Sequence, residues 1–180
     1  MTFPSTPAAV ALLLALGPAT LWAQSPAPDL SDPEVAHVAV TANTIDIELG
    51  RVAQTRARSE AVRQFAQTMI RDHAAVNQQA AALAGRLGVT PRDNAVSQSL
   101  LQGAAQARDA IEKVGDSGFD RAYVEREVAY HQAVLDALDG LLIPTTSNAE
   151  LKQLLTDVRP AIAAHLAHAR QLQSTLAIAR

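Results

Sequence analysis

The sequence predicts an all-α fold built from four long helices and one additional helix. Hydrophobic residues make up 48 % of the 180 residues, but aromatic residues only 3 %, and this composition favours packed helices over sheets. Apolar residues recur at three- and four-residue steps through four long segments, as they do on the buried face of a helix. One compact domain accommodates a chain of this length.

The first 23 residues, MTFPSTPAAVALLLALGPATLWA, form a predicted secretory signal peptide. An uncharged apolar run from Ala8 to Leu16 ends at Gly17-Pro18, and small residues precede the expected cleavage after Ala23. The run is shorter than the ~20 residues that a membrane span needs. We therefore expect a signal peptide over 1–23, a linker over 24–31 and a helical domain over 32–180. The expected location is the periplasm, with association with the outer membrane as a further option.

The first helical hairpin is predicted over residues 32–87. Asp32 can cap the first helix and Pro33 suits its first turn, and apolar residues continue to about Thr55. The second helix is expected over 59–87, where Gly88 suits the residue after a helix. Because the connection is only a few residues long, the two helices should be antiparallel neighbours.

A long crossover and a second hairpin are predicted after Gly88. A weaker amphipathic run over 95–114 gives the additional helix, and a further helix begins near Gly118-Phe119 and should end at Gly140 and Pro144. The final helix starts with the sequence Ser147-Asn148-Ala149-Glu150, which is typical of a capping box. Two hairpins joined by a long crossover are the connectivity of a ferritin-like four-helix bundle. An up-and-down bundle with an extra helix is the alternative.

The charge and the absence of cysteine exclude several functions. The formal net charge of −3 offers no basic surface for nucleic acid. The chain has no cysteine, which excludes disulfides, a lipid-attachment thiol and thiolate metal sites. No serine lies in a recognisable nucleophile motif, so a non-enzymatic role is favoured. No segment after the signal peptide is apolar enough to span a membrane, and an envelope protein or a second copy of the chain is the expected partner.

Histidines occupy the apolar faces of three different helices and predict a polar cluster inside the bundle. His73, His131 and His165 each lie in register with apolar residues near the middle of a helix. A single such histidine is usually a hydrogen-bonded core residue, but three of them suggest a shared site. Glu127 lies one turn before His131, and Glu48 lies at the edge of the inner face of the first helix.

Imidazole and carboxylate groups together suit a transition metal such as iron, manganese, zinc or copper. The candidate ligands are Glu48, His73, Glu127, His131 and His165, with Asp72, Asp120 and Tyr123 as residues that hold them in place. The Glu-x-x-His motifs of a di-iron carboxylate site are absent, since Ile70, Val128 and Ile162 stand three residues before the histidines. This departure argues against ferroxidase-like chemistry.

Three stretches of the chain resemble a known family of exported bacterial proteins, domain of unknown function 4142. They are IDIELGRVAQTRARSEAVRQFAQTMIRDHAAVN, GFDRAYVEREVAYHQAVLDAL and LKQLLTDVRPAIAAHLAHARQL, and the similarity extends from about Asp32 to Leu176. The resemblance implies a ferritin-like bundle and an exported location. It implies no reaction, because none is established for the family.

Two functions are compatible with these observations. The first is a periplasmic bundle whose cluster of histidines and carboxylates binds a transition metal, for metal handling or envelope stress. The second is a non-catalytic structural or partner-binding bundle, in which the same side chains form a closed hydrogen-bond network. The two differ in whether the purified protein retains a stoichiometric metal ion.

Overall fold

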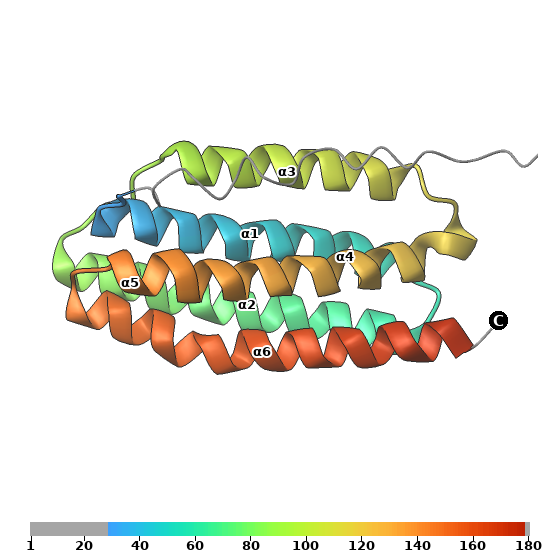
Figure 1. Ribbon diagram of the computed structural model, residues 1–180. Coiled ribbons are helices and arrows are strands. Elements are labelled where there is room, and N and C mark those ends of the chain that lie inside the picture. The colour runs from blue at the N-terminus through green and yellow to red at the C-terminus, as the bar shows by residue number, and fades with distance from the viewer. Residues whose placement is uncertain (1–28, 179–180) are drawn as a thin grey trace, which may run out of the picture.

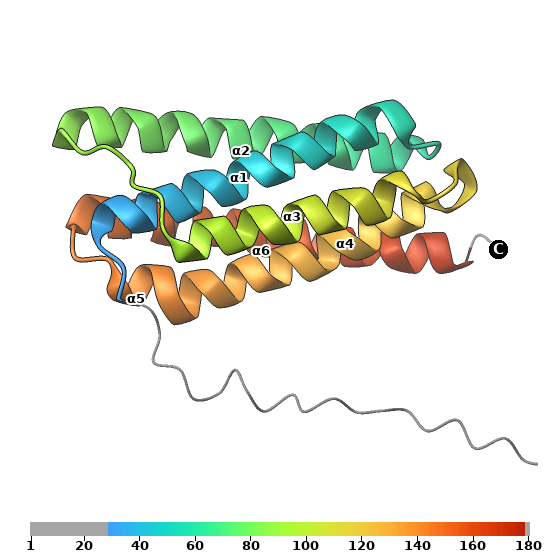
Figure 2. The same cartoon turned by 90° about the horizontal axis from the view of Figure 1, so that it is seen from above.

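The computed structural model describes residues 29–178, which form five long helices and no strand. Helices α1 (Asp32–Arg56) and α2 (Glu60–Leu87) make the first hairpin, and α4 (Asp116–Ala137) and α6 (Ala149–Ile178) make the second. The additional helix, α3 (Ala95–Glu112), lies outside the bundle against α1 and α4 (Figures 1 and 2). The predicted ferritin-like bundle is thereby confirmed. The predicted signal peptide lies outside the described residues.

The helix starts differ in detail from the sequence predictions. Ser31, rather than Asp32, precedes α1, and its backbone N–H and its hydroxyl both donate to the Glu34 carboxylate. The Asp32 carboxylate instead accepts hydrogen bonds from the backbone of Ser147 and Asn148. The predicted Ser147 capping box is wrong, because the Asn148 side chain caps α6 by accepting from the backbone of Glu150 and Leu151.

Helix α4 does not end at Gly140 as the sequence predicts. It continues into a π-helical turn, η1 (Leu138–Leu142), and then into a single α-helical turn, α5 (Ile143–Thr145). Pro144 lies in α5, and its missing N–H removes one backbone hydrogen bond just before this continuous helical segment ends at Thr145. None of the described helices combines the length and the apolar character needed to cross a membrane.

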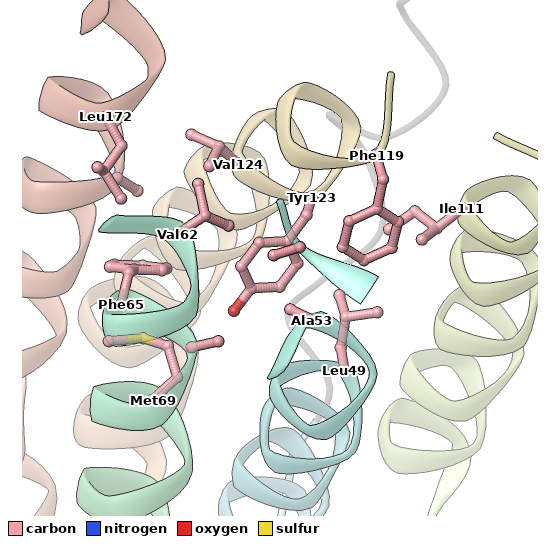
Figure 3. Packing of buried hydrophobic residues seen from close by; sticks show 13 residues of the cluster. Leu49, Ala53, Val62, Phe65, Met69, Ile111, Phe119, Tyr123, Val124 and Leu172 are labelled. Atoms are coloured by element: carbon pink, nitrogen blue, oxygen red, sulfur yellow. The ribbon is translucent and has the colours of Figure 1, made fainter. Parts of the chain in front are cut away.

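A layer of polar side chains separates two apolar clusters along the bundle. The cluster nearer the α1–α2 turn contains stacked and edge-to-face aromatic rings, with Tyr123 between Phe65 and Phe119 (Figure 3). The cluster at the other end is aliphatic and includes Val35 and Leu155. The buried polar side chains of the middle of the bundle come from all four bundle helices: Asn43, Asp46, His73, Glu127, His131 and His165.

Gly50 allows α1 and α2 to approach closely beside this polar layer. A Cβ atom at Gly50 would lie 3.0 Å from Ile70 Cγ1 and 3.2 Å from the backbone oxygen of Ala66. Gly50→Leu is therefore expected to lower the free energy of unfolding by roughly 1–3 kcal/mol, the usual cost of overpacking. Urea unfolding measures this change. The matched control is Gly85→Ala, where nothing lies within 4 Å of the new Cβ and a gain of about 0.5–1 kcal/mol is expected; a neutral Gly50→Leu would contradict the close packing.

Candidate metal centre

Three histidines from three helices meet at the centre of the bundle. The ring centroid of His73 on α2 lies 5.7 Å from that of His131 on α4 and 5.4 Å from that of His165 on α6. The rings of His131 and His165 are also 5.4 Å apart. All three residues are buried. The structure thus brings together the three histidines that the sequence singled out, His165 included.

Each imidazole donates one ring N–H to an acceptor outside the group. His73 Nδ1 donates to Asn43 Oδ1 at 2.8 Å, and the amide of Asn43 is oriented by its own hydrogen bond to Asn77. His131 Nδ1 donates to the backbone oxygen of Glu127 at 3.0 Å, and His165 Nε2 donates to Asp72 Oδ2 at 3.0 Å. A neutral imidazole that donates through one nitrogen presents a lone pair on the other.

The second nitrogen of each imidazole is buried and makes no aligned hydrogen bond. These atoms are Nε2 of His73, Nε2 of His131 and Nδ1 of His165. Buried polar atoms are normally paired, and an exception calls for a physical cause. The three residues offer ligand atoms that lie within 4.8 Å of one another. Tetrahedral zinc–nitrogen bonds of 2.0–2.1 Å require separations of roughly 3.4 Å, so inward movements on the order of an ångström would complete such a site.

Asp46 supplies the carboxylate that faces these nitrogens. Its Oδ2 atom lies 2.8 Å from His73 Nε2 and 3.8 Å from His131 Nε2, yet neither Oδ2 nor the two nitrogens makes an aligned hydrogen bond. Asp46 is fully buried. Asp46 Oδ2 therefore faces two of the three nitrogens, and imidazole nitrogen with carboxylate oxygen is a donor set that suits a divalent transition metal.

Glu48, which the sequence predicted as a ligand, is not brought into the cluster. It is exposed and lines a surface cavity of about 200 Å³ between α1 and α3, together with Arg108. The apolar stripe beside which Glu48 lies faces α3 as well as the bundle centre, since Ile45 and Leu49 line the same cavity. Asp46, two residues earlier on the helix, takes the inward position.

Glu127 lies beside His131 and Asp46 and contacts the partly buried guanidinium of Arg126. Its Oε2 atom is 3.3 Å from His131 Nδ1, and its Oε1 atom is 3.1 Å from Arg126 Nη1. Glu127 is fully buried, and Arg126 exposes 13 % of its side chain. A carboxylate behind a histidine fixes the orientation of the ring and raises its basicity. Glu127 is thus placed to orient His131 through Oε2, while its Oε1 atom contacts the guanidinium of Arg126.

The carboxylates and imidazoles of the cluster shift one another's pKa values. Burial would raise the pKa of Asp46, but the close polar contact with His73 and its charge, with the charge of His131, hold the pKa well below its usual range. Burial and the neighbouring Asp46 charge raise the pKa of Glu127 to about 7. Burial would lower the pKa of His131, but the hydrogen bond to Glu127 and the Asp46 charge raise it. The cluster therefore holds protons near neutral pH that a bound cation would replace.

Two of the residues expected to support the site lie next to it. Asp72 accepts from His165 and also pairs with Arg71 at 2.8 Å. Burial would raise the pKa of Asp72, but these two partners lower it. Tyr123 is fully buried one turn before Glu127, and its hydroxyl has no partner. Burial, with the charges of Glu127 and Asp46, raises the pKa of Tyr123.

Asp120, the remaining candidate, lies elsewhere, as does His168 on α6. Asp120 accepts from the backbone N–H groups of Arg58 and Ser59 and so holds the α1–α2 turn, which corrects its predicted role near the site. His168 is exposed and packs edge-on against Phe65, with ring centroids 5.1 Å apart. The two groups of three or more histidines or carboxylates that could hold a metal among residues 29–178 both lie in this central cluster.

Comparisons with known proteins agree with the fold and the family. The structure is similar to that of CopM in the Cu(II)-bound form, with a TM-score of 0.62 and 16 % identity over 81 % of this chain and 98 % of CopM. It is also similar to a DUF305 fragment from Deinococcus radiodurans, with a TM-score of 0.67 and 15 % identity over 84 % of this chain and 99 % of the fragment. A comparison with curated proteins finds no match. The family model described as domain of unknown function DUF4142 matches residues 17–172, and the chain belongs to this family.

Proposed function

We propose that this protein binds one divalent transition metal ion at the centre of the bundle, through His73, His131, His165 and Asp46, and serves metal handling in the cell envelope. The observation that carries the proposal is the group of three buried histidines whose ligand atoms lie within 4.8 Å of one another, with Asp46 Oδ2 next to the nitrogens of His73 and His131. A closed hydrogen-bond network, the alternative, requires partners for all three nitrogens, and Nε2 of His131 and Nδ1 of His165 have none. The predicted signal peptide would deliver the chain to the envelope.

The donor set favours Cu²⁺ and Zn²⁺. Imidazole nitrogen suits both ions, and a site of fixed ligands generally binds Cu²⁺ more tightly than the other divalent ions of the first transition row. The metal-binding groups described above offer nitrogen and oxygen but no sulfur, which disfavours Cu⁺. The structural similarity to CopM, whose structure holds Cu(II), supports the same choice.

The enclosure of the site favours binding over catalysis. His73 is 3 % exposed, and Asp46 and His131 are 0 % exposed. Structural metal sites are closed by four protein ligands, whereas catalytic sites leave one position open for water or substrate. In the proposed site the three histidines and Asp46 would fill the four positions. We therefore assign the site to metal retention, with stabilisation of the bundle as a consequence.

A metal titration tests the proposal. The protein is produced with its own leader, stripped with a chelator and titrated with Cu²⁺ and with Zn²⁺ against a competing chelator, and its metal content is then measured by elemental analysis. We expect one tightly bound ion per chain, and the same result for His168→Ala, which changes an exposed histidine of α6. Wild-type protein that retains neither ion after removal of excess metal would overturn the proposal.

Asp72→Asn is expected to weaken metal binding about 10- to 100-fold without abolishing it, the usual effect of losing an outer hydrogen-bond partner of a metal-bound histidine. Asp72 holds the N–H of His165, and removing its charge lowers the basicity of that ring. Competition titration measures the affinity. The matched control is Asp157→Asn on the exposed surface of α6. Equal affinities for Asp72→Asn and wild type would show that Asp72 does not support the site.

A further inference from the structure

Two candidate metal positions overlap at His131. One is formed by His73, His131 and His165, and the other by Asp46, Glu127 and His131. His131 has a single free nitrogen, Nε2, because its Nδ1 donates to the backbone oxygen of Glu127. It can therefore serve one metal ion only. If the first position takes Nε2, the second keeps just the carboxylates of Asp46 and Glu127.

A guanidinium already lies between those two carboxylates. Arg126 Nη1 is 3.1 Å from Glu127 Oε1 and 3.5 Å from Asp46 Oδ1. Asp46 thus has one oxygen facing Arg126 and the other facing the nitrogens of His73 and His131. In sites that hold two metals, a carboxylate faces two cations in the same manner. Here one of the two cations is part of the protein.

The position of Arg126 is fixed from its outer side. Its guanidinium stacks on the ring of Tyr130 at 3.9 Å from the ring centroid, and the Tyr130 hydroxyl donates to the backbone oxygen of Ala42 at 2.7 Å. Helix α3 covers this region, since Arg126 lines both cavities beneath that helix, of about 200 and 640 Å³. An arginine stays protonated at every pH that a protein tolerates, so the positive charge is permanent.

We propose that Arg126 replaces a second metal ion and makes this a one-metal site. This inference rests on the metal site proposed above. Removing the guanidinium leaves two fully buried carboxylates without their cation, with ligand atoms within 4.8 Å of each other, and carboxylate oxygens are ligands of divalent ions. Arg126→Met, which keeps an apolar stem against Tyr130, and Arg126→Gln should therefore bind a second ion next to the first. The built-in cation also excludes two-metal chemistry from the wild-type site.

The test is the number of metal ions per chain, together with the electron paramagnetic resonance spectrum of the Cu²⁺ form. Wild type should bind one Cu²⁺ with the spectrum of an isolated ion, even in excess metal. Arg126→Met and Arg126→Gln should bind two ions, whose signals broaden or disappear because the ions lie roughly 3.5–4 Å apart. Arg126→Lys keeps a positive charge and should retain one ion.

The outcomes separate this inference from the proposed function. Wild-type protein that binds no ion contradicts the metal site itself. One ion in wild type and one in folded Arg126→Met and Arg126→Gln, with unchanged spectra, overturns the role of Arg126 and leaves the site standing. A second Cu²⁺ ion that couples magnetically to the first in wild-type protein also overturns the proposed role of Arg126. This last measurement needs no variant, so it applies even if the substitutions prevent folding, which circular dichroism would reveal.

Discussion

Replacing His131 with alanine is expected to remove the metal ion from the protein. His131 contributes Nε2 to the three-histidine group, and its ring lies against both other imidazoles and Asp46. The decrease in metal affinity should exceed the roughly 10- to 100-fold decrease that follows from removing an outer hydrogen-bond partner of a ligand. The reason is that a direct ligand is deleted and a gap remains at the centre of the site. Competition titration with Zn²⁺ and Cu²⁺ measures the affinity.

The matched control for His131→Ala is His168→Ala, since His168 is exposed and contacts Phe65 instead of the cluster. It should bind one ion with wild-type affinity. Circular dichroism establishes that both variants are helical before their affinities are compared. If folded His131→Ala still binds one ion as tightly as wild type, the three-histidine site is wrong.

The second large effect is on thermal stability. An ion that binds only the folded protein, present at 1,000 times its dissociation constant, adds about 4 kcal/mol to the free energy of unfolding. For a chain of this size each kcal/mol raises Tm by about 2–4 °C, so a rise of roughly 8–16 °C is expected on adding Zn²⁺ to stripped protein. The four proposed ligands come from all four helices of the bundle, so unfolding must break the site.

A thermal melt with and without metal measures this rise in Tm. His73→Ala is the informative comparison, because it removes one of the three nitrogens while leaving the other two histidines in place. Its Tm should respond little to Zn²⁺. An equal rise in Tm for His73→Ala and wild type on adding Zn²⁺ would count against a metal ion that links the helices. No rise in Tm for wild type would count against it as well.

The sequence predicted the helices because their apolar periodicity is strong and their connections differ in length. It predicted three of the four proposed ligands because a histidine in register with apolar residues is conspicuous. Asp46 was missed for a physical reason. Helix α1 is covered by α2 on one side and by α3 on another, so its apolar stripe does not mark the bundle centre alone, and Glu48 beside that stripe is exposed next to α3.

A second pattern on α1 indicates that Asp46 lies between helices. Small or polar residues recur at heptad spacing along the face toward α2, and they include Ala39, Asn43, Asp46, Gly50 and Ala53. Small residues let two helices approach closely, as Gly50 does here. A carboxylate within such a stripe is placed between helices, where only a cation or a donor can satisfy it. The acceptors behind the histidines, such as Asn43, depend on helix rotation and could not be derived from spacing.

Arg126 distinguishes the proposed site from two-metal ferritin-like sites. The missing Glu-x-x-His motifs already indicated too few carboxylates. The structure adds the reason for expecting one metal, since the carboxylates of Asp46 and Glu127 are both shared with a guanidinium. Sequence periodicity places Arg126 next to Glu127 on α4 but cannot show that its long side chain turns inward.

The most direct measurement of the central claim is anomalous X-ray diffraction from crystals of the protein loaded with Zn²⁺, with data collected on both sides of the zinc absorption edge. We expect one strong anomalous peak per chain, bonded to Nε2 of His73, Nε2 of His131, Nδ1 of His165 and Oδ2 of Asp46. A zinc peak at the exposed His168 or at Glu48, with none among the three buried imidazoles, would contradict it.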